Sequence, residues 1–359
     1  FHCSCCARNE TLAVSRSFNC LILCEYQDKN MDFKNYKENK QKIIEAGIPD
    51  SMVFDYDNDR LRKIYDQYFI WCEENLKDYR NSFNLGPCYF FYWDTLEANA
   101  GAATDGKNSF IRFSKGYMEQ LHERVGIGNT FFKDSKFTGY HNLQNGISDS
   151  LEYLLFQCST IFTFYHEFAH CVQKQSSSLN ERPENRSYSF YIHVCEYDAD
   201  LNGAQFVSMY MQQYYTDMLP ADMRNEKNFK RLMYLGISSI VITFLLFLNG
   251  EFDLDQKEEI STKFYTKAST HPHTYVRLYY VINHYVRNAK ANGVQIDFKD
   301  TFNSVSVLCD EFFNGTDILK NFMVGMQSHF DEIRKYDMEL YQGLLESPFC
   351  IRHKVQLFG

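Results

Sequence analysis

The chain has 359 residues, of which 45% are hydrophobic and 23% charged. This allows one large domain or two, and excludes wholesale disorder. Its 46 acidic residues outnumber its 37 basic residues, so the formal net charge at pH 7 is −9. Because phosphate binding needs a surplus of lysine and arginine on one face, this balance argues against a nucleic-acid partner.

The 12 cysteines do not have the pattern of a secreted disulfide framework. Several stand alone in apolar runs, where a free thiol packs as a small hydrophobic residue. Five are clustered near the N-terminus, in a spacing that matches no standard zinc pattern, so metal binding there is a minor alternative: Cys3, Cys5, Cys6, Cys20 and Cys24. No charged segment followed by an apolar one opens the chain, so we expect a reducing compartment, most simply the cytoplasm.

Two buried strands are predicted in the first half of the chain. The runs Cys88–Trp93 and 109–113 have the aromatic and apolar composition of strands. The stretch 97–106 between them is rich in small residues and predicts a turn. Apolar residues at helical spacing predict a helix over 57–80, and the Gly- and Asn-rich stretch 126–146 predicts a loop.

Helices are predicted for most of the second half. One runs from Ser150 to about Gln175, with apolar residues along one side and Asp149 as its capping residue. The polar stretch 176–187 predicts a loop. A second long helix follows over 188–215, and the rest of the chain to about residue 345 is predominantly helical.

The segment Leu232 to Leu248 has 17 residues without a charge, just short of the length of a membrane span. Serine, threonine and glycine dilute its apolar character, and a helix buried on all sides has the same hydropathy. We therefore favour a buried core helix and keep membrane association as the alternative.

The motif His166-Glu-Phe-Ala-His170 is an H-E-x-x-H sequence on a predicted helix. Histidines four residues apart on a helix lie within about 40° of each other, so both imidazoles can reach one metal ion. Glu167 lies beside them, where it can take a proton from an activated water. The flanking residues are apolar, and imidazoles there are costly unless they are paired or bound to metal. The motif therefore favours a metal site over a surface helix with two unrelated histidines.

The next predicted helix offers a third ligand, as a catalytic zinc site requires. His193, Glu196 and Asp200 lie on one face of it, at i, i+3 and i+7. If the chain turns back between the helices, Glu196 can bind the same metal as His166 and His170. Asp200 can then accept the spare ring N–H of a ligand histidine. We predict one Zn²⁺ per chain on these three ligands, with His193 as an alternative to Glu196.

H-E-F-A-H followed by E-Y-D-A-D resembles the gluzincin zinc peptidases, whose pattern is H-E-x-x-H and then E-x-x-x-D on a second helix. Two further stretches are similar to the compact, HtpX-like and prenyl-protein endopeptidase branch of that clan. Asn99-Ala100 and 109–116 are similar to its N-A-x-A, strand and glycine segment, and 270–277 is similar to its T-H-P-x-T-x-x-R segment. The resemblance covers about residues 88–280. H-E-F-A-H is also similar to the motif of phage-exclusion peptidases of the Lit type.

The resemblance implies an α+β, mostly helical fold. Its expected core is a small sheet whose active-site edge strand packs on the H-E-x-x-H helix and the Glu-bearing helix. Residues 51–280 would form the zinc metallopeptidase core, 1–50 an unassigned extension, and 281–359 a helical extension packed on the core. The family's edge strand binds substrate, which implies substrate-binding roles for three residues: Asn99, Ile111 and Phe113.

The resemblance also implies that His271 returns to the zinc site and donates to the oxyanion. Without the resemblance, an oxyanion donor and a simple turn with two exposed imidazoles explain the His-Pro-His sequence equally well. The expected activity is hydrolysis of a peptide bond in a protein or peptide substrate, with Glu167 as general base. If His271 joins His166 at one metal, Leu232 to Leu248 cannot cross a bilayer once between them.

Two other classes of protein fit parts of the pattern. A non-catalytic, zinc-stabilised helical interaction domain would need a fourth protein ligand, for instance His193. A helical carboxylate di-iron protein would need two Glu-x-x-His motifs, whereas the chain supplies only His193-x-x-Glu196 in reversed order. We therefore take the interaction domain as the main alternative to the peptidase.

Overall fold

The computed structural model describes residues 34–125, 131–147, 149–174, 188–248, 264–266, 269–313 and 318–351. The five N-terminal cysteines lie outside these ranges. The strands are β1 (Cys88–Trp93), β2 (Ala100–Thr104) and β3 (Ser109–Ser114). The helices are α1 (Lys34–Glu45), α2 (Arg62–Ser82), α3 (Lys115–Val125), α4 (Thr138–Gln144), α5 (Leu151–Lys174), α6 (Tyr188–Gln213), α7 (Glu226–Leu248), α8 (Thr274–Ala291), α9 (Phe298–Phe312), α10 (Ile318–Ser328) and α11 (Phe330–Glu346).

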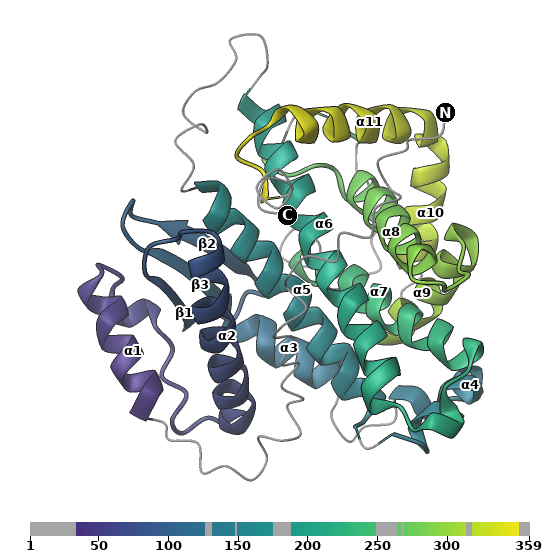
Figure 1. The fold of residues 1–359 in the computed structure, drawn as a ribbon, viewed down its shortest axis with the longest axis horizontal. Coiled ribbons are helices and arrows are strands. Elements are labelled where there is room, and N and C mark those ends of the chain that lie inside the picture. The colour runs from purple at the N-terminus through teal and green to yellow at the C-terminus, as the bar shows by residue number, and fades with distance from the viewer. Residues whose placement is uncertain are drawn as a thin grey trace.

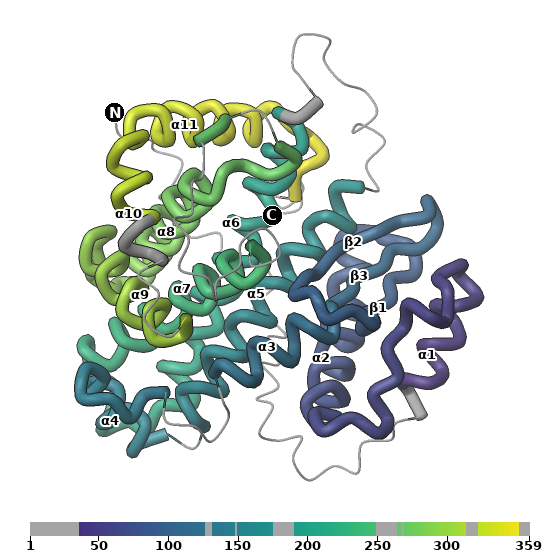
Figure 2. Tube along the Cα trace, turned by 180° about the vertical axis from the view of Figure 1, so that it is seen from behind, coloured from purple at the N-terminus to yellow at the C-terminus, as the bar shows by residue number. Residues whose placement is uncertain are grey.

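The predicted class, α+β and mostly helical, is confirmed. The sheet lies with α1 and α2 at one end of the molecule, and the later helices, α3 to α11, form the rest (Figures 1 and 2). Five short helical turns complete the described structure: Asp50–Met52, Phe131–Lys133, Ser135–Phe137, Tyr214–Met218 and Ala221–Met223. Two of these turns and α4 fall within 126–146, so the prediction of a loop there is wrong for most of the stretch.

The three strands are arranged in the order β1-β3-β2, with β3 parallel to β1 and antiparallel to β2. Both predicted strands are confirmed. The prediction of a turn over 97–106 is wrong for half of the stretch, which forms β2. The residues Ala-Gly-Ala-Ala-Thr have low strand propensity on their own and become a strand by pairing with β3.

The position of β3 corrects the predicted substrate strand. β3 is hydrogen-bonded on both sides, so it is the central strand and has no free edge. Ile111 and Phe113 are both 0% exposed. Their predicted roles in substrate binding are therefore wrong: they are core residues, and β2 is the edge strand beside α5.

Helix α5 is the central element of the core. Nearly all its residues are buried, and it contacts the sheet, α6 and α7. Its first turn is capped by Ser150, whose Oγ accepts a hydrogen bond from the backbone N–H of Tyr153 at 3.0 Å. Ser150 therefore takes the capping position that the sequence suggested for Asp149.

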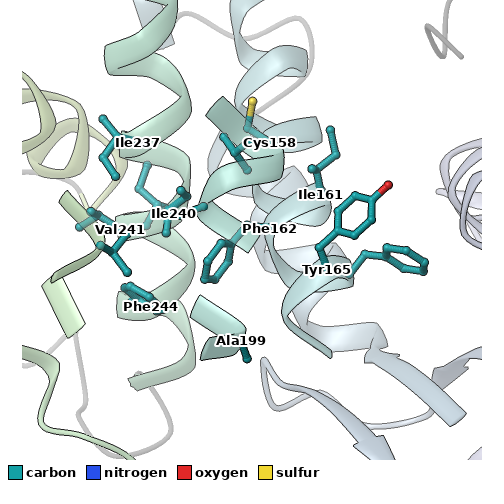
Figure 3. Packing of buried hydrophobic residues seen from close by; sticks show 14 of the residues in the cluster. Cys158, Ile161, Phe162, Tyr165, Ala199, Ile237, Ile240, Val241 and Phe244 are labelled. Atoms are coloured by element: carbon teal, nitrogen blue, oxygen red, sulfur yellow. The ribbon is translucent and has the colours of Figure 1, made fainter. Parts of the chain in front are cut away.

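Helix α7 contains the long uncharged segment, and it packs inside the protein. It has the length and apolarity of a membrane span, but 78% of its most apolar stretch is buried in the structure. Phe162 of α5 and Phe244 of α7 meet edge to face, with ring centroids 5.2 Å apart (Figure 3). The hydroxyls of Ser239 and Thr243 bond to carbonyls of α7 itself, at 2.6 and 2.9 Å. These polar residues are thus accommodated in a buried helix interface.

The C-terminal helices pack directly on the helices of the core. Helix α8 continues past residue 280, where the expected core ends. Helix α11 crosses α6 (Figure 1). At Gly343 of α11 the approach is so close that a Cβ atom would lie 2.7 Å from the side chain of Val194. The segment that follows α11 is also buried, with Cys350 at 0% and Ile351 at 2% exposure.

Candidate metal centre

Helices α5 and α6 lie antiparallel, which brings the two sequence motifs together. Three bonds define this direction: Gln173 donates to Asp198, Asn202 donates to the carbonyl of Tyr165, and Tyr210 donates to Gln157. Gly203 allows the close approach, since a Cβ there would lie 2.8 Å from the carbonyl oxygen of Phe162.

His166, His170 and Glu196 converge at one point between these helices, as predicted. His166 Nε2 lies 3.1 Å from His170 Nε2 and 3.5 Å from Glu196 Oε2. His170 Nε2 lies 3.3 Å from Glu196 Oε1. Bonds of about 2.0–2.1 Å to a tetrahedral zinc would place two ligand atoms about 3.3 Å apart. The three donors therefore have the spacing that a small tetrahedral cation requires.

The hydrogen bonding of Glu196 also fits a bound cation. Glu196 Oε2 is buried and has no hydrogen-bond partner among the described residues, which is costly for a carboxylate oxygen. Two imidazole nitrogens and a carboxylate are ligands that zinc accepts, and other first-row divalent metals use the same donors. The group can therefore hold a metal ion, and the donors alone leave the identity of the metal open.

The electrostatics of the ligands favour positive charge between them. Burial, the largest influence, acts to raise the pKa of Glu196, but His170 and the other nearby imidazoles together lower it well below its usual range. Burial acts to lower the pKa of His170, yet Glu196 outweighs it and raises the pKa to about 9. The charge of Glu196 is thus balanced by protonated imidazole, and a metal ion that binds here displaces that proton.

Asp200 lies behind His166, as predicted. Its Oδ1 is 2.9 Å from His166 Nδ1, and its side chain is fully buried. Burial acts to raise the pKa of Asp200, but Arg277 and His166 lower it. Tyr280 donates to the same carboxylate. The sequence did not reveal Tyr280, although its position three residues after Arg277 on α8 was an available signal.

His193 is not a ligand. It is 0% exposed, its Nδ1 lies 2.6 Å from Tyr336 Oη, and its Nε2 lies 2.7 Å from the carbonyl oxygen of Ser269. Since the carbonyl can only accept, Nε2 carries the proton and Nδ1 accepts from Tyr336. Both ring nitrogens are therefore engaged away from Glu196, and the alternative that His193 replaces Glu196 is wrong.

His271 is brought to the centre, at its exposed side. Its Nε2 lies 3.5 Å from Glu196 Oε1, and its side chain is 55% exposed. Glu167 is buried, at 6% exposure, on α5 between the two histidines. The roles predicted for both residues stay predictions.

Asn99 directly precedes the edge strand β2. Its carbonyl accepts from the backbone N–H of Ser114 at 2.9 Å, and its Oδ1 accepts from the N–H of Ala100 at 2.8 Å. The substrate role predicted for Asn99 stays a prediction. In the middle of the strand, Lys174 Nζ donates to the carbonyl oxygen of Ala102 at 2.5 Å.

A search of protein-family models, of curated proteins and of solved structures finds no match to this chain.

Proposed function

We propose that the chain is a zinc-dependent endopeptidase of the gluzincin type. The observation that carries the proposal is the buried triangle of His166, His170 and Glu196, with Glu167 adjacent to it on the same helix. Three protein donors leave one tetrahedral position for a reacting oxygen. The exposed imidazole of His271 lies beside this open side.

The chain's own residues supply the acid–base steps. When bound, the metal contributes Lewis acidity, which polarises the scissile carbonyl and lowers the pKa of water. Glu167 accepts a proton as the water oxygen adds to the carbonyl carbon, and delivers it to the amine nitrogen as the C–N bond breaks. His271 donates a hydrogen bond to the developing oxyanion.

Strand β2 is the proposed surface for the substrate backbone. The flanking bonds Ser114 N to Asn99 O and Asp105 N to Asn108 O show that odd-numbered residues of this segment face β3. The backbone groups of Ala102 therefore point to the free edge, where its carbonyl accepts from Lys174. An extended peptide that displaces this lysine can add there as a further strand.

The decisive experiment compares wild-type protein with Glu167→Gln. Newly generated protein termini are measured across a proteome after expression of each, and zinc content is measured in the purified proteins. We expect Glu167→Gln to retain zinc and to lose essentially all cleavage. Glu152→Gln, at a buried carboxylate at the start of the same helix, is the matched control and should cleave normally. Full cleavage by the Glu167→Gln protein would refute the general base.

The alternative is a metal-stabilised interaction domain without activity. With His193 engaged elsewhere, His271 is a candidate for a fourth ligand among the residues that the structure describes. The absorption spectrum of the cobalt-substituted protein separates the two, because four protein ligands indicate a structural site and three plus water a catalytic one. A spectrum that is unchanged in His271→Ala and responds to added anions supports the peptidase.

A further inference from the structure

Gln173 lies between His170 and residues 347–351, which follow α11 and are called the C-terminal segment below. Its Oε1 is 2.8 Å from His170 Nδ1. Its Nε2 donates to Asp198 Oδ2 at 2.8 Å and to the carbonyl oxygen of Cys195 at 3.0 Å. The residue is 1% exposed, so the whole amide is used inside the protein.

These partners fix which way the amide points. A flipped amide would place its oxygen against a carboxylate and a carbonyl, which only accept hydrogen bonds at neutral pH. The oxygen of Gln173 therefore faces His170, and Nδ1 of His170 must carry the ring proton. In the neutral imidazole that a metal binds, this leaves the lone pair of Nε2 directed at the metal centre, as a metal ligand requires.

Asp198 connects the amide to the C-terminal segment. It is 0% exposed, and its Oδ2 also accepts a hydrogen bond from the backbone N–H of Ile351 at 2.7 Å. Phe349 of the same segment lies against Tyr191 of α6, with ring centroids 6.3 Å apart. A continuous path of hydrogen bonds therefore runs from the main chain at Ile351 to a ligand imidazole.

We propose that Gln173 is the positioning residue for His170, and that Asp198 and the main chain at Ile351 hold Gln173 in place, so that the C-terminal segment tunes the metal affinity. The inference rests on the proposed metal site. The two ligand histidines then have different orienting partners: the carboxylate of Asp200 for His166, and the neutral amide of Gln173 for His170.

The first test measures metal affinity rather than activity. Zinc binding to the full chain is measured by competition with a chelator, and the unfolding of the metal-free protein is measured in urea. Loss of an orienting partner weakens metal binding by about 10–100-fold, which we expect for Gln173→Leu. Gln157→Leu is the matched control. Gln157 is on α5, like Gln173, but it lies away from the ligands, and the change removes a buried hydrogen bond from Tyr210 of α6. It should lose similar stability and keep its zinc affinity.

A second variant acts from the other end of the path. Ile351→Pro removes the N–H donor and should weaken zinc binding several-fold, while Ile351→Val keeps the donor and the affinity. If wild type binds zinc and both Gln173→Leu and Ile351→Pro bind it equally well, the positioning role is refuted. If wild type binds no zinc, the proposed function itself fails. A loss of affinity in the Gln157→Leu control as large as in Gln173→Leu would also overturn the inference.

Discussion

Arg277 on α8 donates two hydrogen bonds to the carboxylate of Asp200 on α6, from Nε to Oδ2 at 2.8 Å and from Nη2 to Oδ1 at 2.7 Å. The guanidinium also lies over the ring of Phe244 on α7, 4.3 Å from its centroid. One side chain thus joins three helices behind His166. The bidentate geometry fixes the carboxylate that faces the imidazole.

Removing Arg277 should destabilise the protein strongly. Arg277→Met leaves the buried Asp200 without its counter-charge, and breaking a buried pair in this way costs about 3–5 kcal/mol. The free energy of unfolding in urea is the measurement. Lys37→Met, which removes an exposed partner of Asp57, should cost at most about 1 kcal/mol. Equal effects of the two changes would contradict a structural role for the Arg277 pair.

Zinc should raise the melting temperature of metal-free protein. A ligand that binds only the folded state stabilises it by about 2.7 kcal/mol at a hundredfold excess over Kd. Glu196→Gln removes the charged ligand and should abolish most of this shift. Glu73→Gln changes a carboxylate on α2 that accepts from the backbone N–H of Phe90, and should keep the shift. Thermal scans with and without zinc distinguish these outcomes.

His273 should make stability depend on pH. Burial lowers its pKa to about 4, with a smaller contribution from His329. The unfolded chain, with its higher pKa, binds more protons between about pH 4 and 6.5, so the contribution of His273 is present above that range and is lost as pH falls through it. His273 Nδ1 caps α8 by accepting from the N–H of Tyr275. His273→Asn keeps a capping side chain and should flatten the pH dependence of urea unfolding. An unchanged slope would contradict this assignment.

Proline substitutions should distinguish the free edge of β2 from its paired side. Ala102→Pro removes an N–H that points away from β3, which an edge strand tolerates. We expect nearly normal stability and a lower kcat/KM for peptide cleavage. Ala103→Pro removes an N–H on the paired side and should lower the free energy of unfolding. Normal cleavage by folded Ala102→Pro protein would exclude β2 as the substrate strand.

The sequence predicted the features that depend on local spacing. The H-E-x-x-H motif and the i, i+3, i+7 pattern located His166, His170, Glu196 and Asp200, because both patterns require only helical periodicity. The same spacing left His193 open as a ligand. Its true partners, Tyr336 and Ser269, are far away in the chain.

Features that depend on pairing between distant segments were missed or misplaced. Strand β2 has no strand-like composition, so only its partner β3 makes it a strand. The order of the strands in the sheet, and with it the burial of Ile111, does not follow from the pattern of either strand alone. Gln173 lies three residues after His170, but nothing local indicated that Asp198 and Ile351 would fix its amide.

The dependence of His170 on Ile351 has a consequence for biosynthesis. During translation, the H-E-x-x-H helix leaves the ribosome long before Ile351 is added, so an incomplete chain lacks the last donor of the path. Competence to bind metal tightly then follows the addition of Ile351. In the proposed hydrolase, such timing would keep a growing chain from acting on neighbouring nascent polypeptides.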